Sequence, residues 1–269
     1  MSALSLLILA TAALCVGFGV LYLVARRLDN YGIVDVAWAL AFSLLAGFYA
    51  MGGTGWLERR WLVAALAAGW SLRLGMHLLL RVASHHPVED RRYVQLRRDW
   101  AGVFAPKMAG FFQLQALSVV FLGIVFLVPV QNPVPGWHGL EIAGVVLWLV
   151  AVGGEAVADA QLAAFKRDPA NRGQVCTVGL WRYSRHPNYF FEWLVWVAFC
   201  LVALGSPWGW VTLAAPATLL YLLLRVTGIP LTEEQAVRSK GDAYRRYQQT
   251  TSTFFPWRPA KLPRPSLSP

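Results

Sequence analysis

The sequence is poor in charge: only 14% of its 269 residues are Asp, Glu, Lys or Arg, whereas 57% are hydrophobic. A soluble globular domain has about 25% charged residues, so this composition excludes an ordinary soluble fold. Apolar runs long enough to cross a bilayer recur along the whole chain, which indicates a membrane-embedded protein.

Cysteine is also scarce. The three cysteines, Cys15, Cys176 and Cys200, show neither a C-x-x-C spacing nor a pairing pattern, so we predict no disulfide framework and no metal site. No G-x-G-x-x-G follows a strand and no P-loop is present, which excludes a Rossmann domain and a Walker site. Any nucleotide would therefore be held by helices and the loops between them.

The apolar segments predict an all-α integral membrane protein, a bundle of seven transmembrane helices. We place the spans at residues 3–25, 33–51, 61–82, 108–130, 138–159, 188–205 and 208–228. The first segment lacks a basic start and a cleavage motif, so we expect a retained helix rather than a signal peptide. Residues 1–258 are predicted to form one membrane domain, and residues 259–269 a disordered tail.

Orientation follows from the Lys and Arg residues, which are concentrated in alternate connections between the spans. This bias predicts that the N-terminus lies outside and the C-terminus in the cytoplasm. The formal net charge of +10 is then explained by the membrane topology and by an anion site, and we expect no nucleic-acid partner.

Ionisable residues inside the spans fall at helical spacing, so several spans present a polar stripe. The stripes are Asp35 in the second span, Arg73, His77 and Arg81 in the third, Glu155 and Asp159 in the fifth, and Asn188 and Glu192 in the sixth. Such residues usually line a site. The alternative is structural: an ion pair of Asp35 with Arg73 or Arg81, a structural hydrogen bond for His77, and snorkelling at helix ends.

The residue types of the predicted cytoplasmic rim favour a polyphosphate dinucleotide. Arginine suits phosphate, the polar residues of the spans suit ribose or an amide, and tyrosine offers a surface for a base. The candidate phosphate residues are Arg81, Arg91, Arg92, Lys166, Arg167, Arg172, Arg182, Arg185 with the adjacent His186, and Arg225. The other candidates are Asp159, Asn188 and Glu192, with Tyr183, Tyr189, Tyr244 and Tyr247.

Two motifs resemble a known family. "GLWRYSRHPNYFFEW" and "TGIPLTEEQAVRSKGDAYRRYQQTTSTFFPW" are similar to the C-terminal domain of steroid 5-alpha-reductases, most strongly over residues 155–257. The resemblance implies seven membrane helices, NADPH bound from the cytoplasmic side, and hydride transfer to a carbon–carbon double bond conjugated with a ketone. It also implies a multi-pass protein of the bacterial inner membrane and a lipid or steroid-like substrate. We expect a monomer.

The resemblance assigns roles to individual residues. It places the nicotinamide end of NADPH at Asn188 and Glu192. Further cofactor positions match Asp159, Lys166, Arg81 with the nearby His77, Arg225, and Tyr244 or Tyr247. The tyrosine that follows the third-helix histidine in the family is Leu78 here, and the second-helix Gln-Glu pair is absent. Asp35 is the nearest acid.

Hydride addition to an enone leaves charge on the carbonyl oxygen, which needs a proton donor in a dry site. A protonated Asp35 or His77 is the candidate donor, and Glu192 completes the candidate catalytic set.

Two other functions remain open. The pattern R-H-P-x-Y at Arg185–Tyr189, followed by Glu233, Glu234, Tyr244 and Tyr247, also resembles isoprenylcysteine and phospholipid methyltransferases. Their cofactor, S-adenosylmethionine, has a sulfonium cation. Acidic residues such as Glu233 and Glu234 would suit this cation, whereas the many arginines of the chain would not. A non-enzymatic carrier is the third possibility, but no repeat relates one half of the chain to the other.

Overall fold

The computed structural model describes residues 1–85 and 88–260, and within these ranges every regular element is helical. The predicted tail, 259–269, lies outside the described residues from residue 261 onward. The helices are α1 (Ala3–Leu28), α2 (Ile33–Gly52), α3 (Leu57–His85), α4 (Arg91–Asp99), α5 (Phe104–Leu122), α6 (Ile124–Leu127), α7 (Gly139–Arg167), α8 (Pro187–Leu204), α9 (Ala214–Tyr221), α10 (Ile229–Lys240) and α11 (Asp242–Thr250). Short 3-10 helices are Pro129–Gln131, Pro169–Asn171, Gly179–Arg182 and Gly209–Leu213, and a π-helical turn covers Leu222–Val226.

Seven helical segments of the described chain are long and apolar enough to cross a membrane, which confirms the predicted number of spans. They are Ala3–Leu28, Ile33–Gly52, Leu57–Ser84, Phe104–Leu127, Gly139–Arg167, Pro187–Leu204 and Gly209–Lys240. The fifth and seventh segments extend well beyond their predicted ends, because their last turns are polar and lack the apolar signal. The predicted orientation of the termini stays a prediction.

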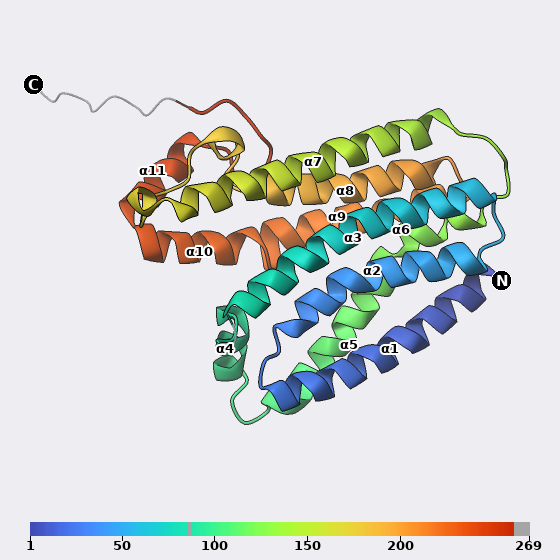
Figure 1. The fold of residues 1–269 in the computed structure, drawn as a ribbon, viewed down its shortest axis with the longest axis horizontal. Coiled ribbons are helices and arrows are strands. Elements are labelled where there is room, and N and C mark those ends of the chain that lie inside the picture. Colours follow the sequence, from blue (N-terminus) through green and yellow to red (C-terminus); the bar gives the residue numbers. More distant parts are fainter. Residues whose placement is uncertain (86–87, 261–269) are drawn as a thin grey trace, which may run out of the picture. The chain divides into compact units, whose positions relative to one another are not determined.

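The chain divides into two compact units, which are described separately. Unit 1 comprises residues 1–141 and 201–215, and unit 2 comprises residues 142–200 and 216–269. In unit 1, α2 packs along α3, and α1 packs against α5 and α2 (Figure 1). In unit 2, α7 and α8 run side by side, and α11 follows α10 after a short turn (Figure 1). The prediction of a single domain over residues 1–258 stays a prediction.

The core of unit 1 is aromatic. Phe42 is fully buried, and its ring centroid lies 4.8 Å from that of Trp38, 5.4 Å from Trp70 and 6.3 Å from Phe126. Gly123 lies where the chain passes from α5 to α6, and a Cβ there would force the buried side chain of Leu45 to move. Between helices in a bilayer, where the surrounding lipid is itself apolar, close contact of such large rings stabilises packing through van der Waals attraction.

A buried ion pair fixes the connection that leads into α7. The guanidinium of Arg59 is completely buried and pairs with the carboxylate of Glu141. Its remaining N–H groups donate to the carbonyl oxygens of Asn132, Val134 and Gly136 at 2.7–3.1 Å. All three nitrogens of Arg59 therefore have a partner, although the residue lies just before the predicted third span and was not a candidate for any site.

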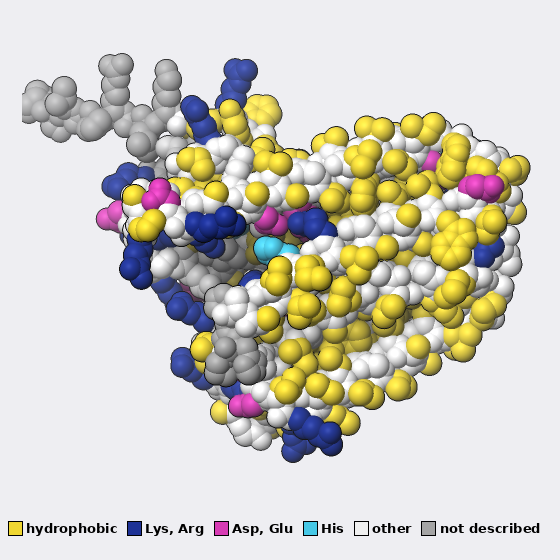
Figure 2. Space-filling view, in the orientation of Figure 1, with side chains coloured by type: hydrophobic (Ala, Val, Ile, Leu, Met, Phe, Trp, Pro, Cys, Tyr) yellow, Lys and Arg dark blue, Asp and Glu magenta, His cyan; other side chains and the backbone are white. Residues whose placement is uncertain are grey.

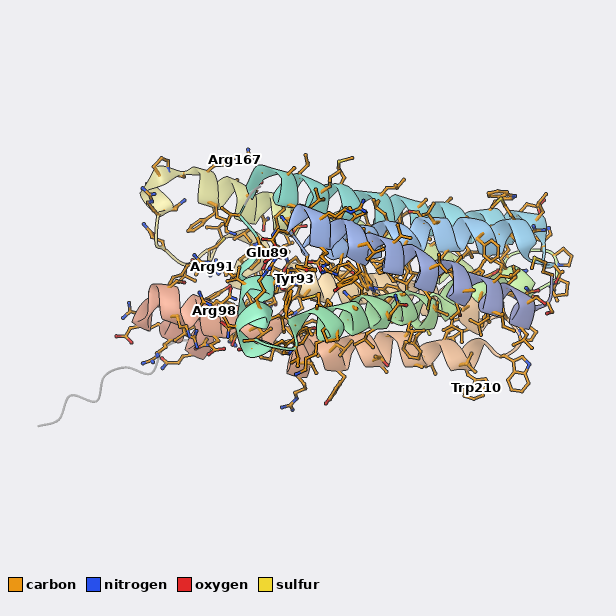
Figure 3. All side chains as sticks on the ribbon, turned by 90° about the horizontal axis from the view of Figure 1, so that it is seen from below. Glu89, Arg91, Tyr93, Arg98, Arg167 and Trp210 are labelled. Carbon is orange, nitrogen blue, oxygen red and sulfur yellow. The ribbon has the colours of Figure 1, made fainter. Side chains whose placement is uncertain are left out.

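The surfaces of the two units are apolar along the helices and charged near particular ends (Figure 2). In unit 1, Lys and Arg gather at the end that carries α4, and the exposed Trp210 lies at the opposite end (Figure 3). In unit 2, they gather over α10, α11 and the last turns of α7 (Figure 2). Exposed tryptophans at a helix end, such as Trp208 and Trp210, are typical of a membrane interface.

Candidate functional site

A polar stripe on the spans of unit 2 begins where α8 starts. Pro187 occupies the first position of α8, a position that suits proline because its missing N–H has no helical partner. Directly after it, the Asn188 side-chain amide donates to a carboxylate oxygen of Asp159 on α7 at 3.3 Å. One turn further along α8, Glu192 accepts from the indole N–H of Trp196 at 3.3 Å. The structure thus brings Asn188 and Asp159 together, as residues on facing helices.

Exposed basic side chains surround the polar end of unit 2. Lys166 and Arg167 form the last turn of α7, and Arg172 and Arg182 follow in the connection to α8. Figure 3 shows Arg167 at the end of α7. Arg225 is exposed within the π-helical turn between α9 and α10. Within the described part of the chain, none of these five residues forms an ion pair with a carboxylate.

The carboxylate of Glu233 on α10 is the centre of a second polar cluster in unit 2. Its Oε1 accepts from Nε of Arg185 at 2.6 Å and from the hydroxyl of Tyr244 at 3.4 Å, and lies 3.2 Å from Nε2 of His186. Its Oε2 accepts from the side-chain amide of Gln248 at 2.9 Å. Both carboxylate oxygens of Glu233 are therefore occupied.

Arg185 is a buried arginine, with only 7% of its surface exposed. Besides Glu233, its guanidinium donates to the carbonyl oxygens of Gln248 and Thr251 at 3.0 and 2.6 Å, and to the hydroxyl of Thr253 at 2.8 Å. All three of its nitrogens are engaged inside unit 2. The structure therefore gives Arg185 a role in tying α8 to the C-terminal segment.

The candidate tyrosines of unit 2 differ in exposure. Tyr244 and Tyr247 are buried, and burial raises the pKa of both phenols well above the ordinary value, so both remain neutral donors. The Tyr247 hydroxyl donates to the carbonyl of Trp181. Tyr189 is only half-buried; its ring stacks on His186 with a centroid distance of 5.5 Å and an interplanar angle of 6°. The fourth candidate, Tyr183, is exposed, so Tyr183 and then Tyr189 have the most ring surface available to a ligand.

The candidate acid of unit 1, Asp35, belongs to a network around α4. Its Oδ2 accepts from Arg92 at 2.6 Å, and its Oδ1 accepts from the hydroxyl of Tyr93 at 2.8 Å. Burial, reinforced by the negative charge of Asp35, raises the pKa of Tyr93 well above its ordinary value. The ion pair that the sequence suggested with Arg73 or Arg81 is instead made by Arg92, from a helix 57 residues further along the chain.

A cap and a second carboxylate complete this network. Asp90 caps the N-terminus of α4; burial alone would raise its pKa, but hydrogen bonds from the backbone and side chain of Arg92 outweigh burial and lower it. Glu89 accepts from the backbone N–H of Tyr31 at 2.7 Å and from Arg97 at 2.8 Å. Figure 3 shows Tyr93 and Glu89 toward the spans of unit 1, with Arg91 and Arg98 on other sides of α4.

The two remaining candidates of unit 1 lie on α3. Arg81 is about half exposed and pairs with the carboxylate of Asp90. His77 is exposed, one turn before it. Asp35 thus has both carboxylate oxygens hydrogen-bonded, whereas the His77 imidazole forms no hydrogen bond with the described residues.

We expect Asp35→Asn to loosen α4. The neutral amide loses the ion pair with Arg92 and weakens the bond from Tyr93, which together contribute about 1–3 kcal/mol. Four arginines in α4 make this helix a trypsin substrate once it frays, so limited tryptic digestion should cleave residues 91–98 faster in the variant. Asp99→Asn, an exposed acid on the same helix, is the control. Equal cleavage of the two variants would contradict a structural role for Asp35.

A comparison with protein families matches a part of the chain that includes both the network around Asp35 and the cluster around Glu233. A family model described as "Protein of unknown function (DUF1295)" matches residues 21–251, which include every candidate residue named above. The chain belongs to the DUF1295 family. It is also 27% identical to the uncharacterized protein C594.04c of Schizosaccharomyces pombe, over 88% of this chain and 76% of that protein. No solved structure matches the chain.

Within this DUF1295 protein, the sequence-based search missed Tyr93, and it gave Arg92 and Glu233 roles other than the contacts that the structure shows. Arg92 and Tyr93 were not linked to Asp35, because no spacing rule connects a span to a loop helix so distant in sequence. Glu233 was considered only as part of a methyltransferase site. The spacing of Tyr244 and Tyr247, three apart on a short helix of otherwise polar residues, was the available signal that α11 packs its aromatic face inward.

Proposed function

We propose that this protein is a multi-pass reductase of the bacterial inner membrane that uses NADPH to reduce a conjugated carbon–carbon double bond of a lipid or steroid-like enone. The supporting observation is the distribution of charge in unit 2. Its exposed cations Lys166, Arg167, Arg172 and Arg182 pair with no carboxylate among the described residues, whereas the acid Glu233 is hydrogen-bonded through both oxygens. Such a surface attracts phosphates and repels a cation.

The residues present fit a dinucleotide with a carboxamide. The Asn188 amide offers both a donor and an acceptor, and Glu192 lies one turn further into the same span, so these two side chains suit the nicotinamide end. The exposed arginines suit the phosphates, since a guanidinium binds phosphate through two parallel hydrogen bonds. The bound cofactor would supply the hydride that adds to the β-carbon of the enone. We expect no direct contact with the cofactor from Arg185, Tyr244 and Tyr247, because their polar groups form hydrogen bonds inside unit 2. These three residues would instead stabilise the backbone that carries the site.

Reduction of an enone also needs a proton, which completes the addition of two hydrogens across the double bond. Of the two donors predicted in unit 1, we favour His77. The carboxylate oxygens of Asp35 both accept hydrogen bonds, and a protonated Asp35 would lose its attraction to Arg92. The His77 imidazole is exposed and forms no hydrogen bond with the described residues, so its N–H is available to donate.

The competing methyltransferase function has less support. S-adenosylmethionine carries a sulfonium cation, and the acids that resemble a methyltransferase site would have to face it. Glu233 is instead bonded to Arg185 and Gln248, and the exposed Glu234 pairs with Arg238 at 2.6 Å. A sulfonium would therefore have to displace existing cations.

Binding of NADPH to the detergent-purified protein tests the proposal. NADPH should raise the melting temperature, since a ligand that binds only the folded state stabilises it in proportion to its occupancy. Asn188→Ala should weaken NADPH binding about tenfold or more, because it removes hydrogen bonds to the ligand. Gln235→Ala, which removes an exposed amide elsewhere in unit 2, should bind like wild type.

Two outcomes would contradict the reductase. One is stabilisation by S-adenosylmethionine and not by NADPH; the other is equal NADPH binding by wild type and Asn188→Ala. If NADPH binds, single-turnover oxidation of NADPH by enone lipids then identifies the substrate, and loss of oxidation in His77→Gln with retained NADPH binding would support the proposed donor.

A further inference from the structure

An open pocket of about 680 Å³ lies in unit 2, between the connection that follows α7 and the helix α11. One wall includes Gln174, Thr177 and Arg182, and the other includes Arg246 and Thr250. No Asp or Glu is among its lining residues in the described chain. Two guanidinium groups that share a pocket without a carboxylate repel each other, so the pocket favours an anion.

The two arginines are available to a ligand. Arg182 and Arg246 are both exposed, and neither side chain forms an ion pair or hydrogen bond with the described residues. Their neighbour Arg245 differs, because it lies 3.7 Å from the carboxylate of Asp242 and does not line the pocket. The sequence suggested Arg182 as a phosphate ligand but gave no reason to choose Arg246.

The walls of the pocket are held together by buried hydrogen bonds. The hydroxyl of Tyr247, next to Arg246, donates to the carbonyl of Trp181, next to Arg182. The Arg185 guanidinium donates to the carbonyl of Thr251 at 2.6 Å, and its backbone N–H donates to the carbonyl of Ser252 at 2.8 Å. These bonds fix the backbone on both sides before a ligand arrives, which lowers the entropic cost of binding.

We propose that this pocket binds a phosphate group through Arg182 and Arg246, with the hydroxyl of Thr177 as an additional donor. Paired guanidinium groups match the oxygens of a phosphate, and the volume suits a small molecule or a headgroup. The phosphate belongs either to the dinucleotide, in which case the inference rests on the proposed function, or to an anionic lipid headgroup.

Pyrophosphate is the first probe, because it presents the shared chemistry alone. It should raise the melting temperature of the purified wild-type protein, and Arg182→Ala and Arg246→Ala should each weaken its apparent affinity about tenfold. Arg245→Ala, a change of the same charge one residue away, should bind like wild type. Arg182→Lys and Arg246→Lys keep the charge without the paired donors and should fall between. Equal losses in all three alanine variants, or no stabilisation of the wild type, would overturn the site.

The source of the phosphate is decided by two further ligands. Weaker NADPH binding in both pocket variants, with competition between NADPH and pyrophosphate, assigns the pocket to the cofactor. Unchanged NADPH binding, with loss of the stabilisation that phosphatidylglycerol nanodiscs give over phosphatidylcholine nanodiscs, assigns it to a lipid headgroup. If both ligands act independently of Arg182 and Arg246, the inference is wrong. Asn188→Ala, measured in parallel, separates failure of the proposed function from failure of the pocket.

Discussion

Replacing Arg59 by alanine should destabilise the protein by about 3–5 kcal/mol, the expected cost of breaking a buried ion pair from one side. The substitution leaves the buried carboxylate of Glu141 without its counter-charge. It also strips hydrogen bonds from the carbonyl oxygens of Asn132, Val134 and Gly136. Chemical unfolding of the detergent-purified variant measures the loss.

Arg60 provides a matched control for this experiment. It is the next residue of α3 and also donates to backbone carbonyls, those of Ala50 and Met51, but it pairs with no carboxylate in the described chain. Arg60→Ala should therefore cost about 1–2 kcal/mol, the contribution of the lost hydrogen bonds. Glu141→Gln should fall between the two, because the amide oxygen still accepts from Arg59 while the charge is lost. Equal losses for Arg59→Ala and Arg60→Ala would show that the ion pair adds nothing.

The number of spans was predictable from the sequence, because length and apolar composition decide whether a segment can cross a bilayer. The ends of the spans were less predictable. The last turns of α7 contain Lys166 and Arg167, and the segment after the π-helical turn contains Glu233, so polar residues hide the continuation of the helix. The backbone hydrogen bonds of a helix continue through these polar residues, so the helices end later than the apolar composition predicts.

The stripe of unit 2 was also predictable, since Asn188 and Glu192 are four residues apart and Asp159 lies on the preceding span. The partners of Asp35 and Arg185 were not predictable from spacing. The pairs Asp35–Arg92 and Arg185–Glu233 join residues about 50 to 60 positions apart in the sequence. Several other acids and arginines of the chain could have formed these ion pairs. A motif such as R-H-P therefore gives the residue types of a site without showing which of them face a ligand and which face the interior.

The second large effect is expected at Glu233. Glu233→Ala leaves the guanidinium of Arg185, only 7% exposed, without a carboxylate, and removes acceptors from Tyr244, Gln248 and His186. The expected loss is about 3–5 kcal/mol, because a buried charge that loses its partner keeps its full desolvation cost. Unfolding in detergent measures this loss, and hydrogen exchange of residues 242–253 reports whether α11 and the following segment detach.

Glu234→Ala is the matched control, since it removes the same side chain from the adjacent position. Glu234 is exposed and pairs with Arg238 at the surface, where an ion pair contributes about 0–1 kcal/mol. The contrast also separates two functions. If Glu233 holds the fold together, Glu233→Gln should recover part of the lost stability, because the amide still accepts from Arg185. If Glu233 instead faced a sulfonium, Glu233→Ala and Glu233→Gln would both retain wild-type stability and lose S-adenosylmethionine binding. The structural role assigned to this carboxylate would then be wrong.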